Sequence, residues 1–501
     1  MKLNYKRTIL VGFAFFLISA FWQAYDAIVP LILANHFGLP ETASGVVMSI
    51  DNILAVFMLP LFGALSDKIM TKFGRRTPFI VLGTAVAVIS FILLTVVNGL
   101  QLNALMQSGI IENYRIASDA YDVSVNAING MFNQGVITEA VRDSQILEAD
   151  LAFEAAKEAL RADALELTLS NIWPLVGFIG VLLVVLVSMA TFRSPAVALM
   201  PDVTVKPLRS KANAVINLMG TAGGIIVLAF SSIFGITKDP YMSFTAYVIA
   251  TCIVMVVGLA IFIATVKEKQ WAEDMEKESE SLGLNEAEAS TDEGGRSLSK
   301  GELKSLFLIL ASVALWYIGY NSITSKYSVY STNVLGVNYG LTLIVAQAAA
   351  IVSYIPVGIL ASKFGRRKTI LAGVAMLTTA FLIGNFIGRG TNPIVMYPIF
   401  ALAGIGWATI NVNSFPMVVE LAKGGQVGKY TGYYYTASMA AQIVAPVLSG
   451  LLYDIFTMRV MFFLFGTVFV ALSFVTMFFV KHGDAKAEKQ DALSALAGAD
   501  D

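Results

Sequence analysis

The chain has 501 residues, of which 56% are hydrophobic and 14% are charged, and its formal net charge is -1. Soluble domains carry roughly a quarter of charged residues, so this composition excludes an ordinary soluble enzyme and indicates a protein whose main solvent is lipid. The single cysteine, Cys252, excludes a disulfide framework and a thiolate metal site.

Apolar runs long enough to cross a bilayer recur along most of the chain. Because a spanning helix needs about 20 mostly apolar residues, we expect twelve transmembrane helices. We place them at residues 8–35, 43–65, 78–98, 172–198, 213–235, 243–266, 304–330, 339–361, 369–390, 393–418, 430–454 and 459–480. The first run lacks a small-residue cleavage site and is expected to be a retained span, not a removable signal.

Two polar segments interrupt this pattern. Residues 99–170 hold eleven acidic and four basic residues between Glu112 and Glu166, and apolar residues recur at helical intervals near the end of the segment. This spacing predicts an amphipathic helix or helical hairpin outside the membrane, a cap or spacer whose deletion over 105–165 leaves function intact. Residues 267–303 are charged and contain Ser and Gly, which favours a flexible cytoplasmic linker. The expected domains are 1–266, the linker 267–303, 304–481 and a tail 482–501.

Basic residues fall in alternate loops, and this asymmetry predicts the orientation of the chain. They precede the first span and follow the second and the eighth: Lys2, Lys6, Arg7; Lys68, Lys72, Arg75, Arg76; Lys363, Arg366, Arg367 and Lys368. Loops rich in Lys and Arg stay in the cytoplasm. Both termini are therefore expected inside, with the chain in a bacterial cytoplasmic membrane.

The two halves of the chain echo each other in two places. The second span ends in LPLFGALSDKIMTKFGRRTPFI and the eighth in IPVGILASKFGRRKTI, so both carry G-x-x-x-[DS] followed by FGRR. After the fourth span, SPAVALMPD is paired with SFPMVVE after the tenth. This internal repetition predicts six helices in each half.

These motifs resemble those of the major facilitator superfamily, whose signature lies between spans two and three. Gly63, Asp67, Gly74, Arg75 and Arg76 match that signature, and Ser362 replaces the acid in the second copy. The segments DNILAVFMLPLFGALSD, GRRTPFIVLG and RSPAVALMPDVTVKPLRSKANAVINLMG are most similar to the sucrose transporters and the wider group of glycoside and cation symporters. The resemblance implies an all-α integral membrane fold of two six-helix bundles that works by alternating access.

Ionisable residues inside the spans are the candidates for coupling transport to an ion gradient, because a charge in a span costs about 3 kcal/mol or more. Asp26 in the first span and Asp51 in the second are the two we select. The alternative for Asp26 is a structural acid paired with a neighbouring helix or one near the outer mouth, and the alternative for Asp51 is a hydrogen bond that packs helices together. Melibiose-type sodium symporters carry two acids where this chain has Ala55 and Leu59. A proton gradient is therefore expected in preference to sodium, with no other cofactor and no nucleotide loop.

Aromatic and amide side chains inside the spans have the chemistry to bind a sugar, although each is more often a packing residue. The candidates for the substrate cavity are Gln23, Arg193, Trp316, Tyr320, Asn321, Gln347, Tyr354, Asn411, Asn413, Tyr434 and Gln442. Arg193 either faces the cavity or extends to the inner surface. Lys326, near the outer end of the seventh span, is either a cavity residue or an interfacial lysine.

The resemblance also implies gating residues at the inner ends of the spans. The candidates are Gly63, Asp67, Gly74, Arg75, Arg76, Asp202, Gly358, Arg366, Arg367 and Glu420. Asp202 and Glu420 occupy matching positions after the fourth and tenth spans. The resemblance implies that these acids bind the basic loops in the outward-open state, within pairs that break and reform as the bundles rock.

The leading functional hypothesis is therefore a proton-driven symporter of a sugar or glycoside. An exporter or antiporter of other small organic solutes, and a sensor that does not transport, remain as alternatives. An enzyme is not expected, because the two histidines, His36 and His482, lie near span ends without clustered ligands. The expected partners are a small-molecule substrate and the lipid bilayer, without nucleic acid, and the chain is expected to be a monomer.

Overall fold

The structure is a computed structural model that describes residues 3–205, 208–281, 298–389, 391–421 and 427–483. The described residues form helices and no strand, which confirms the all-α fold class. The first half contains α1 (Tyr5–Leu31), a π-helical turn (Ile32–His36), α2 (Glu41–Lys68), α3 (Thr77–Gln107), α4 (Ile110–Asn133), α5 (Glu139–Ser170), α6 (Trp173–Asp202), α7 (Arg209–Ile233) and α8 (Thr245–Thr265).

The second half follows after α9 (Glu268–Ser281). It contains α10 (Lys300–Thr324), α11 (Tyr327–Tyr330), a π-helical turn (Ser331–Leu335), α12 (Tyr339–Phe364), α13 (Arg366–Gly384), α14 (Pro393–Val419), α15 (Val427–Phe456) and α16 (Met458–Phe478). Within the described residues, eleven helices are long and apolar enough to cross a membrane. The twelfth expected span corresponds to α12, whose apolar stretch runs over Tyr339–Tyr354.

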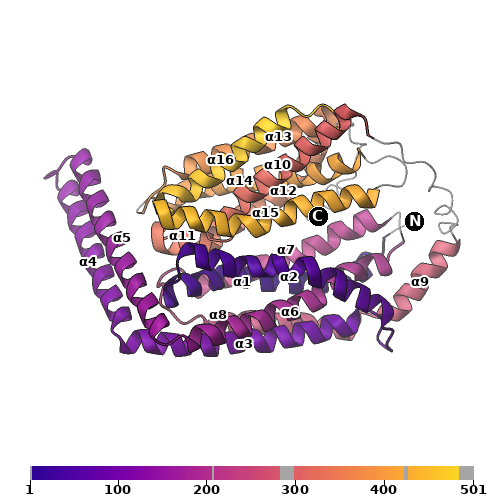
Figure 1. The fold of residues 1–501 in the computed structure, drawn as a ribbon, viewed down its shortest axis with the longest axis horizontal. Coiled ribbons are helices and arrows are strands. Elements are labelled where there is room, and N and C mark those ends of the chain that lie inside the picture. The colour runs from indigo at the N-terminus through magenta and orange to yellow at the C-terminus, as the bar shows by residue number, and fades with distance from the viewer. Residues whose placement is uncertain (1–2, 206–207, 282–297, 390, 422–426, 484–501) are drawn as a thin grey trace.

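The helices pack as two groups that lie side by side (Figure 1). In the first group α1 packs on α7 and α8, and α3 packs on α6 and α8; in the second, α14 packs on α12 and α13, and α16 on α10 and α13. We call these groups the N-half and the C-half. They meet mainly where α2 contacts α15 and α7 contacts α12. Residues of α1 and α7 from the N-half and of α10, α12 and α14 from the C-half line a cavity between the halves.

Following the charge pattern, we call the end of the molecule that carries α4 and α5 the outer end, and the end that carries α9 the inner end (Figure 1). At the outer end the two halves touch backbone to backbone. A Cβ atom on Gly45 would lie 2.1 Å from the carbonyl oxygen of Pro446, and one on Gly340 would lie 2.3 Å from the carbonyl oxygen of Leu228. Only glycine fits these two positions, so the outer end is closed.

The contacts of α2 with α15 that close this end lie in the outer half of α2, where Ser49 donates to the carbonyl oxygen of Ile443 at 2.8 Å. We therefore describe the arrangement of the two halves as closed at the outer end. The seventh expected span is also shorter than predicted. Helix α10 ends at Thr324, and a turn that includes Lys326 separates it from α11.

The polar insert forms a long hairpin of α4 and α5, as the helical spacing predicts. The helix before it, α3, continues past residue 99, the expected start of the insert, to Gln107. The polar side chains of this extension are satisfied inside the protein: His36 shares a hydrogen bond of 2.8 Å with Asn98, and Gln101 donates to the carbonyl oxygen of His36 at 2.9 Å. Polar residues with buried partners can continue a helix that hydropathy alone ends.

The first part of the expected flexible linker is instead a docked helix. The carboxylate of Glu268, at the start of α9, accepts hydrogen bonds from the backbone N–H groups of Arg75, Arg76 and Thr77 at 2.6, 2.8 and 2.7 Å. These groups begin α3 and have no partners within their own helix. Arg7 also pairs with Asp274 at 3.0 Å. The remainder of the linker, 282–297, and most of the tail, 484–501, lie outside the described residues.

Candidate functional site

A cavity of about 580 Å³ lies between the two halves, near the middle of the spans. Six of the predicted side chains line it: Gln23, Asp26, Arg193, Tyr320, Gln347 and Tyr354. A second chamber of about 180 Å³ shares Asp26 and Arg193 with it and adds Asp51, Asn321 and Gln442. The two chambers form the candidate substrate site.

One wall of the larger cavity is an aromatic pair. The rings of Tyr320 on α10 and Trp407 on α14 stack with centroids 3.7 Å apart and planes within 7°. Such a pair presents a flat apolar surface with one polar edge. Trp407 is not among the cavity residues expected from the sequence. It is the only aromatic residue in the segment GIGWATIN.

Opposite this wall, a chain of amide and hydroxyl groups joins the halves. Nε2 of Gln347 donates to Oε1 of Gln23 at 3.1 Å, and Nε2 of Gln23 donates to the hydroxyl of Tyr339 at 3.2 Å. In the described structure, Oε1 of Gln347 and Nε1 of Trp22 are buried without a hydrogen-bond partner. An unpaired buried acceptor and donor are costly, and a polar ligand in the cavity would satisfy both.

The charges in the two chambers do not balance. Asp26, Asp51 and Arg193 contribute two negative charges and one positive charge. Arg193 attracts Asp51, whereas Asp26 is repelled by Asp51. Among the described residues, no cation lies within ion-pair distance of the Asp26 carboxylate. The guanidinium of Arg193 faces the ring of Trp22 at 5.8 Å, so it points into the cavity and does not extend to the inner surface.

Four predicted cavity residues lie elsewhere, inside the packing of the C-half. Trp316 and Tyr434 are fully buried, and Tyr434 shares a hydrogen bond of 2.9 Å with Ser414. The side chain of Asn413 donates to the carbonyl oxygen of Thr409 within the same helix. Asn411 accepts a long hydrogen bond, 3.5 Å, from the hydroxyl of Tyr317. Residue type alone does not tell which face of a helix points to the cavity.

The predicted inner residues form two networks, one within each half. Arg76 pairs with Asp67 at 2.5 Å and with Asp202 at 2.7 Å. In the C-half, Arg366 pairs with Glu420. Both pairs exist here while the outer end is closed, and the expectation that they form in the outward-open state stays a prediction. Each pair fixes a loop to its own half.

The remaining predicted inner residues support these networks through the backbone. The carbonyl oxygen of Gly63 accepts from Arg76 at 3.5 Å. Gly74 has a φ of 119°, and a Cβ there would lie 2.3 Å from the carboxyl carbon of Glu268. Arg75 contributes its backbone N–H, and Arg367 donates to the carbonyl oxygen of Phe478. Gly358 lies within α12.

A buried cluster of charges that the sequence analysis missed closes the outer end. The carboxylate of Glu41, at the start of α2, pairs with Lys326 of the C-half at 2.6 Å and with Arg161 of α5 at 2.9 Å. Glu41 is 3% exposed and Lys326 is fully buried. The cluster therefore joins the N-half, the C-half and the hairpin, and Lys326 is a buried partner in it and does not lie at the membrane interface.

The same cluster contains a helix cap supplied across the interface. Asp454, near the end of α15, accepts from the backbone N–H groups of Glu41 at 2.7 Å and Thr42 at 2.8 Å. It also accepts from the hydroxyl of Thr42 at 2.6 Å. Proline at position 40 offers no side-chain cap to α2, so Asp454 does so, an interaction that typically stabilises a helix by about 1 kcal/mol. Opening the outer end breaks it.

Family models match both halves of the chain. Residues 10–127 match the family described as "MFS/sugar transport protein", and residues 338–497 match "Major Facilitator Superfamily". The chain is 29% identical over 118 residues to the MFS-type transporter ppzB of Metarhizium rileyi and 22% identical over 165 residues to an uncharacterized MFS-type transporter of Methanocaldococcus jannaschii. These matches cover 23% and 32% of this chain, and 24% and 42% of the two relatives.

Solved structures share the fold over nearly their whole length. The inward-open xylose transporter XylE from E. coli matches with a TM-score of 0.58 at 12% identity, over 96% of this chain and 97% of that one. A transporter of the POT family in complex with 5-aminolevulinic acid matches with 0.59 at 9% identity, over 94% and 95%.

The two sets of helices define a multi-pass membrane protein, and the family matches in both halves are to transporters. The chain belongs to the major facilitator superfamily. This confirms the family expected from the sequence, and with it the expectation of a transporter in place of an enzyme.

Proposed function

We propose that the protein is a secondary active transporter that moves a sugar or glycoside together with a proton by alternating access. The observation that carries this proposal is Asp26, a carboxylate that lines the central cavity without a described cation partner. Two acids and one base share the chambers, so one acid needs a proton for the site to be neutral. Asp51 is compensated by Arg193, which leaves Asp26 to bind the proton.

The walls of the cavity support a sugar as the substrate class. Sugar rings have apolar faces that pack on aromatic side chains and hydroxyl groups that bond to amides. The stacked pair Tyr320 and Trp407 offers the first, and the unpaired Oε1 of Gln347 offers an acceptor for the second. The family model that matches residues 10–127 is also described as a sugar transport family.

Uptake of labelled sucrose, maltose and other glycosides into proteoliposomes tests this function. An imposed inward proton gradient is expected to stimulate uptake of at least one sugar, and a sodium gradient alone is not. Stimulation by sodium would assign the coupling ion differently. Absence of uptake for every sugar under both gradients would refute the substrate class.

Arg193 favours a second candidate. A cavity guanidinium that no carboxylate contacts within ion-pair distance, among the described residues, could bind an anionic solute. In this second candidate function, the protein exchanges or exports small organic acids. A sugar acid and simple organic acids belong in the same uptake panel, and preferential uptake or exchange of these solutes would select the second candidate.

Replacing Trp407 by Ala is expected to raise the KM for the transported sugar about tenfold, because one aromatic contact contributes roughly 1 kcal/mol or more. The maximal rate should change less, since the substitution removes binding surface and leaves the acids in place. Trp173→Ala is the matched control, because Trp173 is 76% exposed at the start of α6. Equal KM values for Trp407→Ala and the parent would remove the aromatic pair from the binding site.

A further inference from the structure

The hairpin of α4 and α5 is fixed to the N-half. An apolar cluster, formed by the end of α3, both hairpin helices and the loop before α8, includes Leu105, Ile111, Phe153, Leu160 and Tyr241. Gln101 of α3 also donates to the hydroxyl of Thr168 on α5 at 2.9 Å. The hairpin therefore moves with the N-half as one body.

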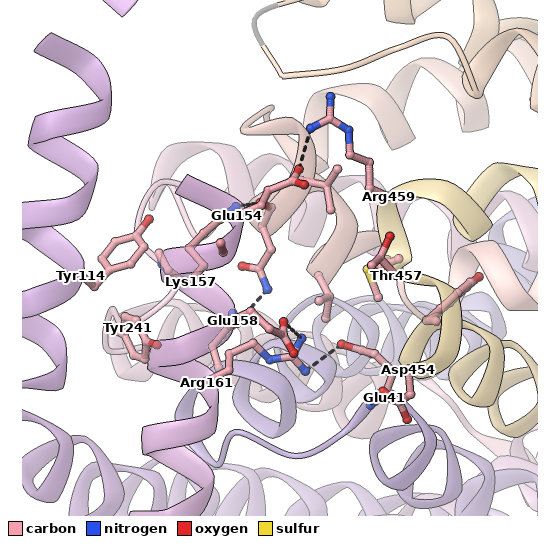
Figure 2. Close-up of a pocket in the computed structure, with 18 residues that line it drawn as sticks. Glu41, Tyr114, Glu154, Lys157, Glu158, Arg161, Tyr241, Asp454, Thr457 and Arg459 are labelled. Atoms are coloured by element: carbon pink, nitrogen blue, oxygen red, sulfur yellow. Dashed lines mark hydrogen bonds and ion pairs between the residues drawn. The ribbon is translucent and has the colours of Figure 1, made fainter. Parts of the chain in front are cut away.

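From this base the hairpin reaches across the outer end and contacts the C-half (Figure 2). Glu154 pairs with Arg459 of α16 at 3.0 Å, and Asp150 lies 3.9 Å from the same guanidinium. Lys157 donates to the carbonyl oxygen of Asn333, and Arg389 lies over the ring of Phe153 at 4.7 Å. Four side chains of α5 thus contact a half to which the hairpin does not belong.

The hairpin also completes the buried charge cluster. Arg161 donates to the carboxylate of Glu41 at 2.9 Å and to the carbonyl oxygens of Ala34 and Leu39 at 3.1 and 2.9 Å. Between the hairpin, α2 and the C-half lies a pocket of about 390 Å³, which these contacts enclose. The role expected from the sequence is a cap or spacer, and these contacts add a direct link from the hairpin to the C-half.

We propose that the α4–α5 hairpin is a gating element of the transporter: a strap, carried by the N-half, whose contacts with the C-half hold the outer end closed. The proposal rests on the alternating access of the proposed function. Opening the outer end separates the two halves, so the contacts of Glu154, Lys157 and Phe153 with the C-half break in every cycle. Their strength sets how often the outer end opens.

A charge swap tests the strap without requiring transport. Glu154→Arg and Arg459→Glu each replace an ion pair by a repulsion between like charges. The double variant restores the ion pair with the two charges exchanged between the helices. Each single variant is expected to raise the ratio of outward-open to inward-facing molecules roughly two- to fivefold, as for the loss of a partly exposed ion pair. The double variant should return most of the way to the parent. Glu166→Arg, an exposed position on the same helix, is the matched control.

The readout is a pair of spin-label distances, in a Cys252→Ala background. Labels at Trp173 and Phe386, which are 76% and 83% exposed at the outer ends of the two halves, report opening there. Labels at Lys72 and Lys363 report closure at the inner end. The expected result is a longer outer distance together with a shorter inner one in the single variants, with reversal in the double variant.

Unchanged distances in both single variants, or an outer distance that stays long in the double variant, would overturn the proposal. If a single variant loses its defined distances, the milder Glu154→Gln takes its place, with the same expected direction. Because these distances are measured without substrate, a protein that transports no sugar can still confirm or refute the strap. Failure of the proposed function and failure of the strap are therefore distinguishable.

The strap also predicts a dependence on the outer pH. Burial lowers the pKa of Lys157 to about 7; Arg389 and Arg459 act in the same direction, and Glu154 and Asp150 oppose them. A lysine in water has a pKa of about 10.4, so release of Lys157 takes up a proton between these values. The outward-open fraction is therefore expected to fall as the pH rises from about 7 to about 9. Lys157→Met should remove this dependence, and an unchanged pH profile in that variant would exclude Lys157 as its source.

Discussion

Replacing Asp26 by Asn is expected to abolish accumulation of substrate against its gradient. A proton gradient of one pH unit supplies about 1.4 kcal/mol, which supports about tenfold accumulation for one coupled proton. Asparagine cannot bind that proton, so the internal concentration should stop at the external value. Exchange of labelled for unlabelled substrate at equal concentrations needs no net proton movement and should persist. Both quantities are measured by uptake in proteoliposomes.

The matched control for this experiment is Asp119→Asn, which makes the same change at an exposed position of α4. It should accumulate substrate as the parent does. If Asp26→Asn also concentrates its substrate normally, the carboxylate has no part in coupling, and Asp51 becomes the remaining acid of the two chambers. If Asp26→Asn loses both equilibrium exchange and accumulation, Asp26 takes part in substrate binding.

Replacing Glu41 by Gln is expected to shift the protein strongly toward the outward-open state. The substitution leaves Lys326 and Arg161 buried without their shared carboxylate. Removal of one member of a buried ion pair typically costs about 3–5 kcal/mol, and opening the outer end relieves this cost by admitting water to both cations. The outer spin-label distance between Trp173 and Phe386 measures the shift.

Two further variants compare how much each residue of this charge cluster contributes to keeping the outer end closed. Lys326→Met leaves Glu41 paired with Arg161, so its shift should be smaller than that of Glu41→Gln. Glu158→Gln should change little, because the Glu158 carboxylate is 79% exposed and lies 3.9 Å from Arg161. An outer distance that is the same in Glu41→Gln and the parent would show that the cluster does not hold the outer end closed.

The transmembrane helices could be predicted from the sequence because their signal is local. Each span is an apolar run bounded by charged loops, and the structure places helices at the expected positions. The errors occur where tertiary contacts replace that local signal. Asn98 and Gln101 extend α3 through buried hydrogen bonds, and Glu268 docks α9 onto the start of α3.

The outer gate could not be predicted because its members are far apart in the chain. In the sequence, Glu41 is an ordinary acid at the expected start of a helix. Arg161 is one of many charged residues in an amphipathic segment. Only the fold brings both to Lys326. The helical hairpin could be predicted from its spacing, but its contacts with Arg459 could not.

The cavity was predicted in part. Asp26 was selected because a charge inside a span is rare and costly, and this argument is independent of which face the residue occupies. Aromatic and amide residues can bind substrate only if they lie on the helix face that lines the cavity. Trp316 and Tyr434 were predicted to line it but are buried in the C-half. Trp407 was missed for the same reason.

Coupling of sugar transport to a proton can be measured as proton movement itself. Proteoliposomes that contain a pH-sensitive dye receive a transported glycoside from outside, with no gradient imposed. We expect the lumen to become more acidic as protons enter with the sugar, the signal to saturate with sugar concentration, and Asp26→Asn to abolish it. Sugar entry without any change in lumenal pH, or with alkalinisation, would contradict proton symport.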